Sequence, residues 1–234
     1  MNTTVSREPE QLVLDLPHRP ALGAEDFLVS SSNRAGVDLV DSWPAWPHPA
    51  AIVAGPERSG KSHLVHVWQL KSGAAIVSAD QLSDASIAHF ETVPALAVED
   101  IDRGIADQRV LFHLLNLARE TKRSILLTSR ALPGEITITL PDLRSRLRAA
   151  PLVEIEPADE ALLKAVLVKL FADRQLTIEP HVINHLALHM ERSIGAAERV
   201  VAEADRLALA LGRRVSRTLA AEALRSVAES RESE

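Results

Sequence analysis

The residues with the clearest chemical meaning run from Gly55 to Ser62, where the sequence reads Gly-Pro-Glu-Arg-Ser-Gly-Lys-Ser. This stretch matches G-x-x-x-x-G-K-[ST], the loop that wraps the phosphates of a nucleotide. Glycines allow sharp turns that bring backbone N–H groups close to the phosphates. Lys61 can reach the β- and γ-phosphates, and Ser62 can ligate Mg²⁺. We therefore predict a nucleotide site formed by Gly55, Pro56, Glu57, Arg58, Ser59, Gly60, Lys61, Ser62 and His63.

Two further groups of polar residues follow apolar stretches downstream of this loop. Residues 95–98 are apolar and lead into Glu99 and Asp100, the arrangement of a Walker B strand. There one carboxylate holds Mg²⁺, usually through water, and the next orients or deprotonates the attacking water. Thr128 and Ser129 end a second apolar stretch and can contact the γ-phosphate or that water. We therefore predict catalytic roles for Glu99, Asp100, Thr128 and Ser129, with Ser62 and Glu99 as metal ligands.

Three arginines, Arg144, Arg146 and Arg148, lie on a short predicted helix over residues 140–148. Arginine stabilises the charge of a transferring phosphoryl group through paired hydrogen bonds. A solvated basic helix surface explains the same residues, and the pattern alone favours that interpretation.

The elements that must position these residues alternate between strands and helices up to about residue 156, and only helices follow. Such alternation predicts a parallel sheet covered on both faces. The expected strands lie at residues 50–54, 74–78, 95–98, 124–128 and 152–155. Helices are expected at 62–70, 110–121 and 159–174, and from about residues 180, 193 and 216 onward. We predict an N-terminal segment (1–20), an α/β P-loop domain with a five-stranded parallel sheet (21–156) and a small all-α lid domain (157–234).

Composition excludes several classes of protein. The chain has 234 residues, is 46% hydrophobic and contains no cysteine. Disulfides and cysteine-based metal or redox sites are therefore excluded. The sequence has no run of about 18 apolar residues and no secretory h-region, so we expect a cytoplasmic protein without a membrane span. The net charge of −6 argues against broad nucleic-acid binding, which requires a basic surface.

Taken in order, these motifs resemble the AAA+ core of the bacterial replication initiator DnaA. The resemblance covers about residues 26–211 and is carried by residues 60–64, 99–101, 127–129 and 143–147. It implies that ATP or ADP binds with Mg²⁺, with Phe27 and Asn33 near the adenine. It also implies that Arg146 is an arginine finger, which acts on ATP bound to a neighbouring subunit.

Two positions depart from the DnaA pattern. Glu99 stands where that core has aspartate, which alters the geometry of the metal site. The lid arginine of the family is expected where this chain has Gly195, and Arg199, one helical turn further on, is the alternative. Loss of the lid arginine implies a preference for ADP and weak self-catalysed hydrolysis.

A short segment near the N-terminus suggests a partner. It places Gln11, Leu12, Leu14 and Leu16 in an alternating pattern. This segment resembles the peptide that docks into the bacterial sliding clamp, with leucines at alternate positions for apolar pockets and a glutamine for a polar anchor. An ordinary edge strand is the alternative.

A clamp peptide joined to a DnaA-like core resembles the Hda-type regulatory inactivators of initiation. No basic helix-turn-helix domain follows the lid, so direct sequence-specific DNA binding is not expected. The resemblance implies DnaA and the sliding clamp as partners, and hydrolysis of DnaA-bound ATP as the outcome. Self-association is left open. Two alternatives remain: an autonomous AAA+ ATPase of the helicase-loader or initiator type, and an adaptor with a vestigial nucleotide site.

Overall fold

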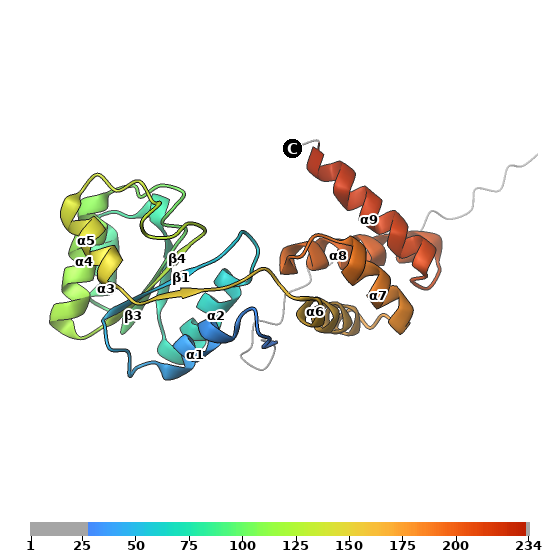
Figure 1. Cartoon of the computed structure of the whole chain (residues 1–234), viewed down its shortest axis with the longest axis horizontal. Helices are drawn as coiled ribbons and strands as arrows, with labels where there is room; N and C mark the ends of the chain where they lie inside the picture. Colours follow the sequence, from blue (N-terminus) through green and yellow to red (C-terminus); the bar gives the residue numbers. More distant parts are fainter. Residues whose placement is uncertain (1–27, 233–234) are drawn as a thin grey trace, which may run out of the picture.

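The computed structural model describes residues 28–232, and its central feature is a five-stranded parallel sheet (Figure 1). The strands pair in the order β2-β3-β4-β1-β5. Their bounds are β1 Ala50–Ala54, β2 Ala75–Ser78, β3 Ala95–Glu99, β4 Ser124–Ser129 and β5 Leu152–Glu154. Every strand begins and ends within one residue of its predicted range, because each apolar run is bounded by proline, glycine or polar residues. The predicted fold class is confirmed.

Helices cover both faces of this sheet, because neighbouring side chains of a strand point to opposite faces. Ile52 and Leu127 face a core that includes Phe90 of α3. Val53 faces the other core, which includes Leu64 of α2. The helices around the sheet are α1 Arg34–Ser42, α2 Lys61–Ser72, α3 Asp84–Phe90, α4 Gln108–Thr121 and α5 Pro141–Ala149. The sheet is therefore closed by α1 and α2 on one side and by α3, α4 and α5 on the other.

The three tryptophans of the chain fix the proline-rich segment that leads into β1. The ring of Trp46 stacks on that of Trp68 at 5.4 Å, and Trp43 meets Trp68 edge-on at 6.2 Å. The Trp43 indole N–H donates to Ser124 Oγ at the start of β4, at 3.0 Å. Because Trp68 is fully buried in α2, these contacts tie the entry of β1 to the helix that follows the phosphate loop.

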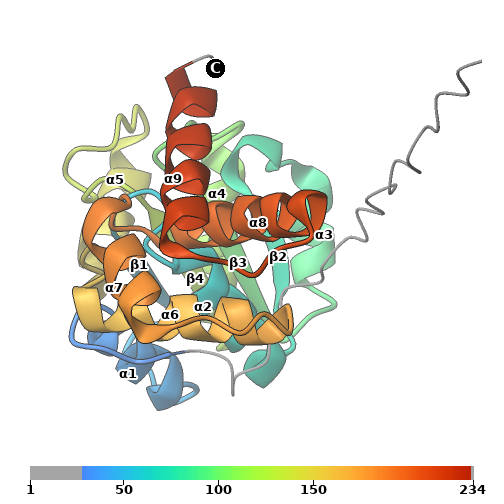
Figure 2. The same cartoon turned by 90° about the vertical axis from the view of Figure 1, so that its right-hand side faces the viewer.

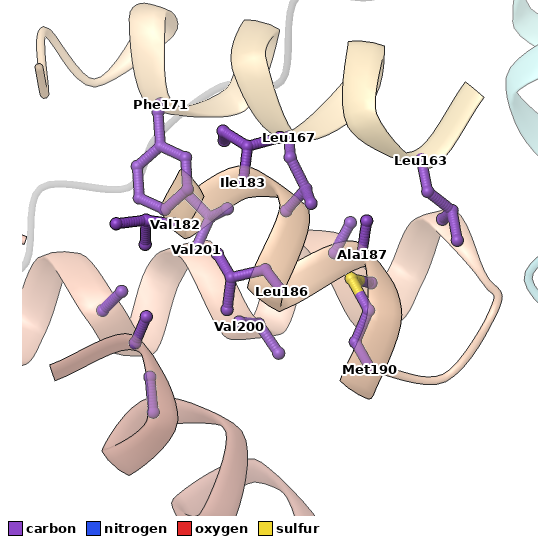
Figure 3. Packing of buried hydrophobic residues seen from close by; sticks show 14 of the residues in the cluster. Leu163, Leu167, Phe171, Val182, Ile183, Leu186, Ala187, Met190, Val200 and Val201 are labelled. Carbon is purple, nitrogen blue, oxygen red and sulfur yellow. The ribbon is translucent and has the colours of Figure 1, made fainter. Parts of the chain in front are cut away.

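The remaining helices form a lid with a core of its own. They are α6 Glu160–Asp173, α7 Pro180–His189, α8 Ile194–Leu211 and α9 Arg217–Glu232. Figure 3 shows Phe171 of α6 among apolar residues of α7 and α8, and Figure 2 shows the lid in front of the sheet. Asp159 caps α6 by accepting from Leu162 N at 2.7 Å, and Ser193 caps α8 by accepting from Ala196 N at 3.2 Å. Both helices begin within one residue of their predicted starts, whereas the domain limits at residues 20 and 156 stay a prediction.

Within residues 28–232, none of the helices combines the length and the apolar character that crossing a membrane requires.

Candidate nucleotide-binding site

The phosphate loop leaves β1, which lies between β4 and β5 in the sheet, and enters α2. Gly55 N donates to Ser129 O of β4 at 3.1 Å, and Ile155 N, just beyond β5, donates to Ala54 O at 2.7 Å. The loop therefore starts between two anchored strands. Gly60 ends it with φ of 102°, a left-handed conformation that favours glycine. The N-terminus of α2 follows at once, so its free N–H groups face the loop as they do at anion-binding helix ends.

The contacts of Lys61 and Ser59 indicate whether the loop suits a bound phosphate group. Lys61 Nζ donates to Gly55 O at 2.8 Å and to Pro56 O at 2.7 Å, so the lysine lies across the loop. Burial lowers the pKa of Lys61, and the nearby carboxylates of Asp100 and Asp102 oppose that shift only in part. Among the residues that the structure describes, the buried Ser59 hydroxyl has no hydrogen-bond partner. A buried cation and an unpartnered hydroxyl on one loop fit an anionic ligand that accepts hydrogen bonds.

A pocket of about 310 Å³ opens between this loop, the ends of β3 and β4, and the lid. From the phosphate loop and the start of α2 it is lined by Glu57, Arg58, Gly60, Lys61, Ser62 and His63. The other lining residues are Asp100, Arg103, Arg130, Ile194, Gly195 and Glu198. It lies outside the carboxyl ends of parallel strands, where open α/β sheets bind their ligands. Four of the lining residues carry a positive charge and three carry a carboxylate.

Of the two predicted Walker B carboxylates, only Asp100 lines the pocket. Its backbone is left-handed, with φ of 58°, and its N–H donates to Thr128 Oγ1 at 3.0 Å. Arg103 Nη1 lies 3.5 Å from Asp100 Oδ2. Glu99 is half-buried and pairs in register with Ser78 of β2. By strand alternation Glu99 shares the face of Ala97, which belongs to the core on the α2 side.

The two hydroxyls predicted at the end of β4 are both buried and engaged. Thr128 is 1% exposed and Ser129 is fully buried. Thr128 accepts from Asp100, and Ser129 Oγ donates to Ala131 O at 2.6 Å. Neither residue lines the pocket. Both side chains hold the strand ends together, and their predicted contact with the γ-phosphate or the attacking water stays a prediction.

The next residue, Arg130, lines the pocket and was not among the predicted site residues. Its Nε lies 2.8 Å from Asp102 Oδ2, and its backbone N–H donates to Asp102 Oδ1 at 2.9 Å. Burial alone raises the pKa of Asp102, but these hydrogen bonds from Arg130 outweigh burial, and the net pKa is lowered. The available signal was positional, since Arg130 follows the last residue of β4 at the carboxyl edge of the sheet.

The lid contributes Ile194, Gly195 and Glu198 to the pocket. Burial raises the pKa of Glu198, and this shift is opposed only in part by the charges of Arg174 and Arg199. Arg199, the expected alternative for a lid cation, does not line the pocket, and its Nη2 lies 3.9 Å from Glu191 Oε2. The lid wall of the pocket therefore carries a carboxylate and no cation of its own.

Of the two residues predicted to lie near the adenine, the structure describes only Asn33. Asn33 is 2% exposed, and both ends of its amide are used: Oδ1 accepts from Ser30 N at 2.9 Å and Nδ2 donates to Leu28 O at 2.8 Å. The side chain therefore shapes its own turn. Phe27 lies outside the described residues, as do Gln11, Leu12, Leu14 and Leu16 of the predicted clamp peptide.

Arg146 lies away from the pocket, on α5. Leu143 and Leu147 of this helix are buried in the core shared with α4. Arg146 is half-buried, whereas Arg144 and Arg148 are exposed. Among residues 28–232, the Arg146 side chain forms no hydrogen bond or ion pair. Arg146 therefore stays a predicted arginine finger, on a helix outside the pocket lining.

Comparisons with known proteins identify the fold. No protein-family model matches the chain. A DnaA protein of Symbiobacterium thermophilum is 29% identical over 217 residues, which cover 80% of this chain and 47% of that protein. The chain thus spans less than half the length of that relative.

Two solved structures are similar in shape. Domain III of Thermotoga maritima DnaA superposes with a TM-score of 0.75 at 17% identity, covering 90% of this chain and 98% of that one. AMPPCP-bound DnaA from Aquifex aeolicus superposes with a TM-score of 0.67 at 21% identity, covering 79% and 65%. The chain therefore has the fold of a DnaA-like AAA+ P-loop domain, with the phosphate loop at its centre.

Proposed function

We propose that this protein is a nucleotide-binding AAA+ regulator that restrains the initiation of DNA replication. Held on the sliding clamp in the bacterial cytoplasm, it stimulates hydrolysis of the ATP bound to DnaA. Its own nucleotide, ADP or ATP, serves as a structural ligand. Three features support this proposal: the composition of the pocket, the position of Arg146 and the clamp-like peptide near the N-terminus.

Nucleotide binding is supported by the phosphate loop. Lys61, Ser59 and the N-terminus of α2 would hold the phosphates, and Ser62 would hold Mg²⁺ together with a carboxylate from the end of β3. Asp100 is better placed than Glu99 for that contact, because Asp100 lines the pocket. When bound, Mg²⁺ would neutralise part of the phosphate charge. The AMPPCP-bound DnaA structure provides a precedent for adenine nucleotides in this fold.

The observation that carries the regulatory proposal is the position of Arg146. A cation with a role at its own phosphate loop would line the pocket, and Arg146 does not. It is the most shielded of the three arginines of α5, and among the described residues its side chain has no partner. An arginine supplied in trans stabilises charge that develops in the transition state of a neighbouring ATP, with effects of about 10³–10⁵ on rate in measured systems.

The test is single-turnover hydrolysis of labelled ATP bound to DnaA, in the presence of clamp loaded on DNA. Arg146→Ala should abolish the stimulation while ADP binding and clamp binding persist. Arg148→Ala is the matched control, because it removes the same charge from an exposed position of the same helix and should retain most of the activity. Equal losses from both variants would favour a solvated basic surface. Full activity of Arg146→Ala would reject the trans role.

The clamp requirement is tested in the same assay. Simultaneous replacement of Gln11, Leu12 and Leu14 by alanine should remove both clamp capture in a pull-down and the stimulation of hydrolysis. The urea midpoint of the variant should match that of the wild type, because the segment precedes the described core. Retained clamp capture would reject this segment as the docking peptide.

A second candidate, an autonomous ATPase, is favoured by one observation. Asp100 lines the pocket together with Lys61, so a carboxylate and a phosphate-loop lysine share one cavity. Steady-state turnover of ATP by the isolated protein separates the two candidates. Turnover that is lost in Asp100→Asn and retained in Arg146→Ala would establish the autonomous ATPase.

A further inference from the structure

The lid touches the phosphate loop at Arg58, and the contact is tight. Ile194 N, at the start of α8, lies 3.3 Å from Arg58 O and donates to it. A Cβ placed on Gly195 would lie 2.9 Å from Arg58 Cδ and 3.2 Å from Arg58 Cγ. The aliphatic stem of Arg58 therefore occupies the space in which a side chain at Gly195 would begin.

Arg58 adopts this position at an energetic cost. Its φ is 60°, in the left-handed region that residues with a Cβ rarely adopt. Strain of this kind, on the order of 1–3 kcal/mol, gathers at ligand clamps and switch regions. The side chain is 38% exposed, and its Nε lies 3.7 Å from Glu57 Oε1. A surface pair at that distance contributes little, so it does not explain why an arginine stands where glycine would be unstrained.

The distribution of charge around the pocket suggests why an arginine occupies position 58. From the lid, the pocket receives Ile194, Gly195 and Glu198, which together carry one carboxylate and no cation. Arg199 is directed to Glu191 instead. Arg103 and Arg130 lie near Asp100 and Asp102, at the strand ends. Among the pocket cations, Arg58 is therefore the one that packs against the lid.

We propose that Arg58 is the lid-side phosphate-binding residue of this protein. Its guanidinium leaves Glu57 to contact the terminal phosphate of the bound nucleotide, while its stem stays packed on Gly195. One side chain then joins the phosphate loop, the ligand and the lid. Gly195 is glycine because the arginine stem needs its space. A planar guanidinium suits this task, since it offers two parallel donors to one phosphate. This inference rests on the proposed nucleotide binding.

The experiment measures binding of Mg²⁺–ADP by calorimetry, with urea unfolding of each variant as a check on folding. Arg58→Gly keeps the left-handed backbone without strain, so it should fold, and it should bind ADP roughly tenfold more weakly. Arg148→Ala is the control, because it removes the same charge from an exposed position outside the pocket lining, and the ADP affinity should then change by less than about threefold. Gly195→Arg alone should weaken binding, because two stems then compete for one space.

The double variant Arg58→Gly with Gly195→Arg is the decisive test. It moves the cation to the other side of the same contact and vacates the space that the new side chain needs. We expect its ADP affinity to return to within roughly threefold of that of the wild type. A double variant no tighter than Arg58→Gly would overturn the proposal.

The outcomes also separate this proposal from the proposed function. If the wild type binds ADP and Arg58→Gly changes the affinity no more than Arg148→Ala does, Arg58 has no special role, although the nucleotide site stands. If the wild type and Lys61→Ala both fail to bind ADP or ATP, the nucleotide site is lost, and the inference with it.

Discussion

Gly55 offers the sharpest test of how the phosphate loop is held. A Cβ at this position would lie 2.5 Å from Ile155 O, 3.0 Å from Ser59 Oγ and 3.2 Å from Ile155 Cβ. The nearest atom belongs to the backbone beyond β5, so it cannot rotate away as a side chain would. Gly55→Ala therefore forces the loop and the end of β5 apart.

The expected cost follows from these contacts. Inserting a methyl group into a packed site typically costs about 1–3 kcal/mol. The backbone bond from Ile155 N to Ala54 O, 2.7 Å long, must also lengthen, and a net hydrogen bond contributes about 1 kcal/mol. We therefore expect Gly55→Ala to lower the free energy of unfolding by about 2–3 kcal/mol. In a chain of this size that corresponds to a fall in Tm of roughly 5–10 °C.

Tryptophan fluorescence in urea is a suitable assay. All three tryptophans pack together beside α2 and β1, so their emission reports unfolding of the sheet and not of the lid. Gly134→Ala is the matched control: a Cβ there meets no atom of the described structure within 4 Å. We expect that variant to stay within about 0.5 kcal/mol of the wild type. Equal costs for the two glycine variants would refute the close approach of the loop and β5.

Two further predictions concern the lid and the strand ends. Phe171 is fully buried in the lid core, so Phe171→Ala should destabilise the lid by about 3–5 kcal/mol in circular dichroism, whereas the tryptophan transition should move far less. Asp102→Ala should cost about 1–2 kcal/mol, because Asp102 accepts two hydrogen bonds from Arg130, whose side chain is 37% exposed and therefore partly screened. The pKa of Asp102 is lowered in the folded protein, so this contribution is complete above the unfolded pKa of about 3.9 and is lost as pH falls through the folded pKa. Urea unfolding should therefore show an equal difference between wild type and Asp102→Ala at pH 7 and pH 5 and a smaller one below about pH 4, and a difference that grows on acidification would contradict this assignment.

Local sequence signals were sufficient to predict the bounds of the strands and the starts of the lid helices. The strands were predicted to within one residue because apolar runs end at proline, glycine or charged residues. The starts of α6 and α8 were predicted near Asp159 and Ser193, whose side chains cap their own helices. Helices α1 and α3 were not predicted. The second of these has only seven residues, and its one buried side chain, Phe90, leaves no helical period to detect.

Which polar residues face the pocket could not be predicted in the same way. Thr128 and Ser129 have the right chemistry at the right edge of the sheet, yet both hydroxyls bind neighbouring backbone groups. Arg130, one residue later, enters the pocket instead. The difference depends on Asp102, which holds Arg130 from another strand end. A sequence pattern places residues at an edge, but the pairing across strands decides which of them reach the pocket.

The position of the lid arginine expected from the resemblance was still harder to interpret from sequence. The resemblance directs attention to Gly195 and Arg199, both on α8, because the expected residue belongs to the lid. In the structure, Arg58 of the phosphate loop lines the pocket and packs against Gly195, so Gly195 matters through the side chain that it lacks. An absent side chain gives no local signal, and its meaning appears only when the packed neighbour is known. A substitution at one position is therefore best interpreted together with the residue that fills its space.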